Sequence, residues 1–177
     1  MEETSRDCPS RGIGVNDAVV YETYGVCTVS AIEVRNFGGG EVEYYVLQSV
    51  RDSRSRFFVP TSNTVLAERM RPVLTADEIN SLIAAMPDQE LISVDDEKQR
   101  KEVCRSILSS GERSKLIALI KSLYIRRQEL AGMNRKLRSF EEKSLAEAEN
   151  MLYDEFAYVL GIERSEVVPY ITAAIKK

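Results

Sequence analysis

The first part of the chain has the hydrophobic pattern of short β-strands. Runs rich in valine, tyrosine and phenylalanine alternate with turn residues, which is typical of strands of about four to eight residues. Tyr24-Gly25 favours a turn. The glycines at 38–40 favour a hairpin tip, because glycine allows backbone conformations that other residues rarely adopt. Cys27, Val29 and Ala31 alternate along the second run and are predicted to share one strand face. The expected strands cover 17–21, 26–34, 41–50 and 55–60.

The pattern changes to a helical period near Pro72. Apolar residues then recur every three or four positions, which indicates amphipathic helices. Thr75 and Glu78 have the spacing of a capping box, in which each side chain bonds the backbone of the other residue, and Ser139 and Glu142 repeat that spacing. The expected helices cover 76–86, 95–109, 112–131, 139–160 and 164–175.

Together these patterns predict an α+β fold of two modules. The first module is expected to be a small SH3-like or Tudor-like β-barrel, because such barrels are built from a few short strands with frequent turns. The second is expected to be an all-α helical bundle. The predicted boundaries are a flexible N-terminal segment at 1–13, a β domain at 14–73 and a helical domain at 74–177.

The residue types offer little for catalysis or metal binding. The sequence contains no histidine, the commonest general base and metal ligand, and no G-x-x-x-x-G-K-[ST] phosphate loop. Its three cysteines are too widely spaced to indicate a disulfide framework or a metal site. Cys27 lies among apolar strand neighbours and is expected to fill the core. We therefore expect no enzyme activity, no cofactor, no metal and no small-molecule substrate.

The sequence also predicts no membrane association. No apolar run approaches the roughly 18 residues that a membrane-spanning helix needs. The N-terminus is polar and lacks the apolar region of a secretion signal. We therefore expect a cytoplasmic protein without a membrane partner.

Positive charge is concentrated in the helical half. The formal net charge of the chain is −4, but residues 98–143 contain thirteen Lys or Arg and five Glu. A basic surface on an acidic protein can contact the phosphate backbone of DNA. The same charges are also compatible with the solvated face of a helical bundle, and charge alone does not distinguish the two interpretations.

Several sequence segments resemble those of a known protein family. In the β half these are "GVNDAVVYETYGVCTVSAIEVR", "EYYVLQS", "FFVPTSN" and "RMRPVL". They resemble the N-terminal module of the CarD family of bacterial transcription regulators, a module that is shared with the polymerase-binding domain of the transcription-repair coupling factor. In the helical half, "ILSSGERSKLIALIKSLYIRR" and "RSFEEKSLAEAENMLYDEFAYVLGI" are similar to the same family. The resemblance rests on the order and spacing of these segments and covers most of the chain from Gly14 to Ile162.

The resemblance implies a Tudor-like domain that docks on the β subunit of RNA polymerase. It also implies a helical domain that contacts promoter DNA without sequence preference and modulates the stability of the open complex, so that the protein associates with the nucleoid through the polymerase. The polymerase contacts that it implies are Arg35 and, around the place of a second family arginine, Arg56 and Phe58. The implied DNA contacts are Lys98, Arg100, Lys101, Arg105 and Lys143. A family tryptophan that wedges into melted DNA falls near Glu97, but this sequence contains no tryptophan.

Two other interpretations stay open. The β module could serve a general protein-binding adaptor, in which the helices are structural and have no direct DNA role. An autonomous helix-turn-helix repressor would need a recognition helix and usually a dimer. The long β N-terminus and the diffuse basic run argue against the repressor, and we expect a monomer.

Overall fold

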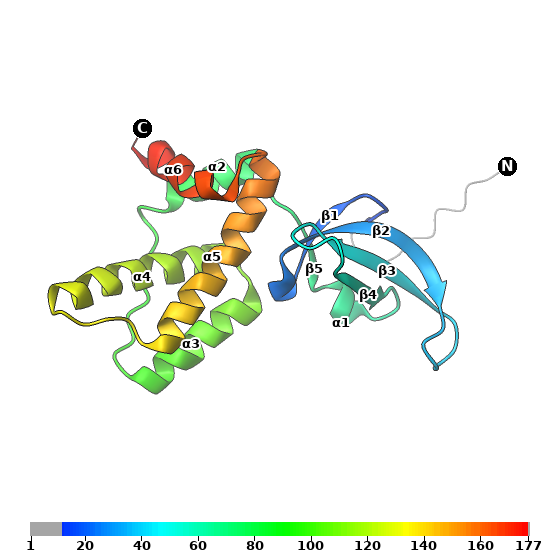
Figure 1. Cartoon of the computed structure of the whole chain (residues 1–177), viewed down its shortest axis with the longest axis horizontal. Helices are drawn as coiled ribbons and strands as arrows, with labels where there is room; N and C mark the ends of the chain where they lie inside the picture. The colour runs from blue at the N-terminus through cyan, green and yellow to red at the C-terminus, as the bar shows by residue number, and fades with distance from the viewer. Residues whose placement is uncertain (1–11, 177) are drawn as a thin grey trace. The chain divides into compact units, whose positions relative to one another are not determined.

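The computed structural model describes residues 12–176 of the chain (Figure 1). The chain divides into two compact units, with the boundary between Val73 and Leu74. The expected flexible segment, 1–13, lies outside the described residues except for its last two positions, and of these Ile13 packs against the core of the first unit.

The first unit is a five-stranded antiparallel sheet. Its elements are β1 (Ala18–Tyr21), the short 3-10 helix η1 (Glu22–Tyr24), β2 (Val26–Arg35), β3 (Val42–Ser49), β4 (Arg56–Pro60), α1 (Thr64–Ala67) and β5 (Met70–Pro72). The strands follow the order β4-β3-β2-β1-β5 (Figure 1). All four expected strands are present, whereas α1 and β5 were not predicted. Closure of this sheet into a Tudor-like barrel stays a prediction.

A β-bulge in β2 decides which of its side chains face the core. Cys27 and Val29 have no exposed surface and belong to the apolar core of this unit. The register with β3 shifts between Val29 and Ala31, so Ser30 is an extra residue and Ala31 points to the opposite face. The prediction that Ala31 shares the face of the other two residues is therefore wrong. The same shift turns Arg35 away from the core face.

The second unit is a helical bundle. Its helices in the described range are α2 (Ala76–Ala85), α3 (Glu97–Ser110), α4 (Arg113–Gly132), α5 (Ser139–Leu160) and α6 (Arg164–Ile175). α5 contacts each of the other four helices (Figure 1), and its Leu152 and Phe156 lie fully buried in the core. Every expected helix is found within two residues of its predicted bounds. The predicted α+β fold of two modules is confirmed.

Hydrogen-bonded caps fix where the helices begin. Thr75 and Glu78 form the expected capping box of α2, with Glu78 N donating to Thr75 Oγ1 at 3.2 Å and Thr75 N donating to Glu78 Oε2 at 2.7 Å. The hydrogen bonds that Thr75 donates to this carboxylate, first from its backbone N–H and then from its hydroxyl, hold the pKa of the Glu78 carboxyl below its usual range. In α5 the box begins one residue before the predicted position, because the backbone N–H of Arg138 donates to Glu141 Oε2 at 2.8 Å.

The sheet unit is expected to fold without the helical unit. Its core is formed by residues within 19–70, and the helical core by residues within 79–171. A fragment of residues 1–73 should therefore give the circular dichroism spectrum of a β-protein and unfold cooperatively on heating, although so small a core is of modest stability. The fragment 74–177 serves as the helical control. A disordered 1–73 fragment, under conditions where the full chain is folded, would show that this division is wrong.

Candidate protein-docking and nucleic-acid surfaces

The sheet face opposite the core carries Arg35 and Phe58. Arg35 ends β2 opposite Val42, and Phe58 lies in β4 opposite Val46. The guanidinium carbon of Arg35 is 5.6 Å from the centroid of the Phe58 ring, which is within cation–π range. Its Nε and Nη2 donate to Glu33 Oε1 at 2.9 and 2.7 Å. The structure thus brings together two of the residues expected to contact the polymerase.

Two further aromatic residues extend this patch. The ring of Phe37 meets Tyr44 and Phe58 edge-on at centroid distances of 5.2 and 5.3 Å, and 62% of Phe37 is exposed. Exposed aromatic rings beside an arginine have the composition of a protein-binding hot spot. Sequence reasoning missed Phe37 and Tyr44, although an aromatic residue directly before a glycine-rich hairpin tip was an available signal. The four residues Arg35, Phe37, Tyr44 and Phe58 are called the sheet docking face below.

Arg56 is on the same face of the sheet but far from Arg35. It is the first residue of β4 and pairs with Gln48 of β3, whereas Arg35 pairs with Val42. Strands rise about 3.3 Å per residue, so these partners are roughly 20 Å apart along β3. Arg56 is exposed and lies at the margin of the candidate surface, away from its centre.

An exposed basic face runs along α3. Lys98, Lys101 and Arg105 are spaced by three and four residues, which places them on one side of the helix, and all three are exposed. Within residues 12–176, no ion pair joins any of them to an acid. These three residues, called the α3 basic face below, are free to meet phosphate groups.

Arg100 points instead into the helical unit. Its Nε donates to Glu141 Oε1 at 2.8 Å, and its Nη1 donates to the carbonyl oxygens of Val94 and Asp95 at 2.8 and 2.9 Å. The Arg100 side chain is 11% exposed and Glu141 is fully buried. Withdrawing a guanidinium from a buried carboxylate costs several kcal/mol, about 3–5 where one partner is removed. Arg100 therefore holds α3 to α5, and its expected DNA contact stays a prediction.

Lys143 is exposed near the start of α5. The first turns of α5 and α3 lie side by side, because the Arg100–Glu141 pair and the Arg138–Glu97 pair, 3.4 Å between Nη2 and Oε2, join them. Lys143 therefore belongs to a helix that begins next to the α3 basic face, and it stays a candidate for DNA contact.

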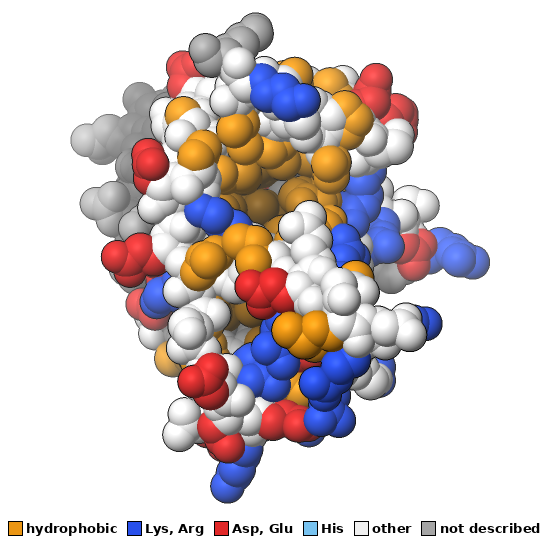
Figure 2. Space-filling model, turned by 90° about the vertical axis from the view of Figure 1, so that its left-hand side faces the viewer, with side chains coloured by type: hydrophobic (Ala, Val, Ile, Leu, Met, Phe, Trp, Pro, Cys, Tyr) orange, Lys and Arg blue, Asp and Glu red, His pale blue; other side chains and the backbone are white. Residues whose placement is uncertain are grey.

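Basic and apolar side chains gather on one face of the molecule. Figure 2 shows Lys and Arg side chains in the lower half of this face and a hydrophobic hollow in its upper half. Between the end of α2 and helices α4, α5 and α6 lies an apolar pocket of about 290 Å³. Lys121 lines this pocket, and its Nζ donates to the carbonyl oxygens of Met86, Pro87 and Gln89 at 3.2, 2.7 and 2.8 Å. Lys121 therefore holds the end of α2, and its ammonium group is bound within the helical unit.

The described part of the chain offers no metal site. No group of three or more His, Cys, Asp or Glu that could hold a metal ion occurs in residues 12–176. Cys27 and Cys104 are free and buried. Burial raises the pKa of the Cys27 thiol to about 11 and also raises that of Cys104. None of the helices described here is long and apolar enough to cross a membrane.

These two thiols are expected to be unreactive in the folded protein. The thiolate is the nucleophile, and a pKa of about 11 for Cys27 leaves almost none of it at neutral pH. In a Cys8→Ser variant, which removes the thiol outside the described residues, Ellman's reagent should label Cys27 and Cys104 far more slowly in native than in urea-denatured protein. Equal labelling rates in the two states would contradict the burial of both side chains.

Comparison with known proteins identifies the first unit. Residues 13–74 match the family model of the CarD-like/TRCF RID domain, so this unit is a CarD-like/TRCF RID domain, as the sequence resemblance predicted. The chain is also 24% identical over 153 residues to a Bacillus subtilis (strain 168) protein named "Putative transcription factor YdeB". That match covers 86% of this chain and 95% of the relative. Both findings support a role in transcription.

Proposed function

We propose that this protein is a transcription regulator that docks on the β subunit of RNA polymerase and contacts promoter DNA. The RID family match carries the proposal, because the same residues, 13–74, contain the whole sheet docking face. In this scheme the helical unit meets the DNA without sequence preference. The outcome is a changed stability of the open promoter complex.

The chemistry of the sheet docking face supports a protein partner. Arginine and aromatic residues dominate binding hot spots because they combine large contact area with directed hydrogen bonds. Among the described residues, Glu33 is the hydrogen-bond partner of Arg35, and a partner carboxylate can accept from the remaining N–H groups of that guanidinium. Phe37 and Phe58 add apolar area that is exposed in the free chain.

The α3 basic face supports a weak and sequence-independent DNA contact. Lys and Arg side chains bind phosphates through a charge interaction that carries no sequence information and weakens with salt. Docking on the polymerase would hold promoter DNA near this face at an effective concentration of about millimolar, as tethering does. The net charge of −4 would limit binding to DNA elsewhere. The proposed activity therefore needs both units in one chain.

A protein-binding adaptor without a DNA role is the second candidate, because the sheet docking face alone suffices to bind a partner. Co-purification with the isolated β subunit tests docking, and titration of a promoter duplex into polymerase with and without the protein separates the two functions. The regulator should raise the affinity of polymerase for the duplex. The adaptor would leave DNA affinity unchanged.

Neutralising the α3 basic face is expected to weaken DNA binding and leave polymerase docking intact. In the triple variant Lys98→Gln, Lys101→Gln, Arg105→Gln, each lost phosphate contact should reduce the log–log salt slope by about 0.9. Fluorescence anisotropy of a labelled duplex at several salt concentrations measures this slope. Docking should persist because the three residues lie outside the RID domain.

A matched control variant removes three positive charges elsewhere in the helical unit. Its three substitutions to glutamine are at exposed Lys115, Arg127 and Lys176. Equal salt slopes for the two triple variants would place the DNA contact away from the α3 basic face.

A further inference from the structure

Two arginines share one buried carboxylate where α3, α4 and α5 meet. The Nε of Arg100 and the Nε of Arg126 each donate to Glu141 Oε1 at 2.8 Å, and Glu141 Oε2 accepts from the backbone N–H of Arg138 at 2.8 Å. Glu141 has no exposed surface. Two guanidinium charges thus meet one carboxylate charge, so the cluster has an excess positive charge. Partial removal from water strengthens the attraction of that charge for an anion.

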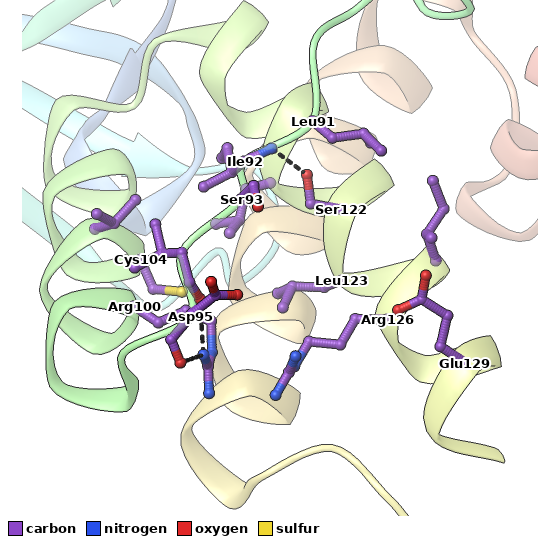
Figure 3. Close-up of a pocket in the computed structure, with 14 residues that line it drawn as sticks. Leu91, Ile92, Ser93, Asp95, Arg100, Cys104, Ser122, Leu123, Arg126 and Glu129 are labelled. Atoms are coloured by element: carbon purple, nitrogen blue, oxygen red, sulfur yellow. Dashed lines mark hydrogen bonds between the residues drawn. The ribbon is translucent and has the colours of Figure 1, made fainter. Parts of the chain in front are cut away.

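Arg126 keeps donors that this cluster does not use. Within the described residues, the Nε–H of Arg126 donates to Glu141. The two terminal amino groups of its guanidinium stay available to a ligand. The Arg126 side chain is 35% exposed, against 11% for Arg100. Figure 3 shows Arg126 reaching from α4 toward Arg100 of α3, with Glu129 further along α4. Arg126 can therefore bind an anion without giving up Glu141.

A second pocket lies beside this cluster, at the end of α4 and the start of α5. It has a volume of about 280 Å³, and its acidic lining residues are Glu129 and the already paired Glu141. Three further cations line it: Arg135, Lys136 and Arg138. The turn that carries them is fixed, because Arg135 N donates to the carbonyl oxygen of Leu130 at 2.8 Å and Asn134 adopts a left-handed φ of 54°, which asparagine tolerates. The backbone of this turn is therefore held in place, and the exposed side chains of Arg135, Lys136 and Arg138 extend from it at the pocket.

We infer that this pocket binds a phosphate group. The planar guanidinium matches phosphate oxygens with paired hydrogen bonds, and such charge-assisted bonds are the strong ones. Five cationic side chains line the pocket, of which Arg100 is bound to Glu141 and Arg138 is paired with Glu97, so Arg126, Arg135 and Lys136 supply the charge for a ligand. Its volume of about 280 Å³ is that of several water molecules at about 30 Å³ each, which leaves room for a phosphate. The phosphate can belong to a small phosphorylated molecule or to the DNA backbone, since the recognition chemistry is the same.

Titration of inorganic pyrophosphate into the full chain at low salt tests the inference by isothermal calorimetry. Saturable binding is expected for the unmodified protein, and Arg126→Gln should weaken it by about tenfold or more, because charge-assisted hydrogen bonds are lost. The matched control is Arg127→Gln, the next residue of α4, which is exposed and absent from the pocket lining. Lys136→Gln, at an exposed position outside the helices, should weaken binding without threatening the fold.

Failure to bind pyrophosphate saturably would overturn the inference, as would equal affinities of the Arg126→Gln and Arg127→Gln variants. Competition with a short duplex identifies the source of the phosphate. If Arg126→Gln weakens binding of both pyrophosphate and duplex, the pocket takes a phosphate of the DNA backbone. If it weakens pyrophosphate alone, the pocket takes a small phosphorylated molecule. No polymerase is present, so a negative result here leaves the docking proposal untouched.

Discussion

Arg35→Glu is expected to weaken binding of the protein to the polymerase β subunit by about a hundredfold, or roughly 3 kcal/mol. The substitution removes the guanidinium above Phe58 and the charge expected to meet the partner. It also introduces a carboxylate beside Glu33, in place of the present ion pair. Losing an exposed ion pair alone would cost only about 0–1 kcal/mol, so a much larger effect would locate Arg35 within the interface. Surface plasmon resonance with immobilised β subunit measures the change.

The control for this variant is Arg54→Glu. Arg54 belongs to the same unit, its side chain is 93% exposed, and its substitution changes the net charge equally. It lies in the turn between β3 and β4, outside the sheet docking face. If both variants lose affinity equally, the effect reflects long-range charge, and Arg35 is not at the centre of an interface.

Glu155→Gln is expected to lower the free energy of unfolding of the helical unit by about 3–5 kcal/mol. Glu155 is 2% exposed and binds Arg113, which is 17% exposed, through two hydrogen bonds of 2.6 and 3.1 Å. Its Oε1 also accepts from the backbone N–H of Leu74 at 2.9 Å. The neutral amide would leave the Arg113 charge in a poorly solvated site without its carboxylate. Urea unfolding followed by helical circular dichroism measures the loss.

Glu147→Gln provides the comparison on the same helix. Glu147 is exposed on α5, and surface substitutions of this kind usually change stability by less than about 0.5 kcal/mol. Equal unfolding midpoints for the two variants would mean that the Arg113–Glu155 pair contributes nothing beyond an exposed ion pair.

Local signals in the sequence predicted most of the fold. Gly111 and Gly161 end α3 and α5 with φ values of 57° and 63°, a conformation that glycine adopts without strain. The helical spacing of the apolar residues also predicted which side of each helix is buried. The bulge at Ser30 could not be predicted in this way, because one extra residue leaves the composition of a strand unchanged while it reverses every side chain that follows.

The candidate surfaces were predicted only in part, because charge along a sequence does not reveal partners. Lys98 and Arg100 are two residues apart, yet one is exposed and the other is bound to Glu141, 41 positions further on. Lys121 and Arg113 were likewise counted as basic surface, but Arg113 donates to Glu155 and Lys121 donates to the carbonyl oxygen of Pro87. Contacts between residues so distant in sequence depend on how the helices pack, which periodicity does not specify.

The open-complex lifetime on a purified promoter tests the central claim most directly. It should be measured with polymerase alone, with the unmodified protein, with Arg35→Glu, and with the triple variant of the α3 basic face. We predict that the unmodified protein changes the lifetime and that neither variant does, although the triple variant still docks on the β subunit. The account would be contradicted by a lifetime that the unmodified protein leaves unaltered, or by full activity of the Arg35→Glu variant.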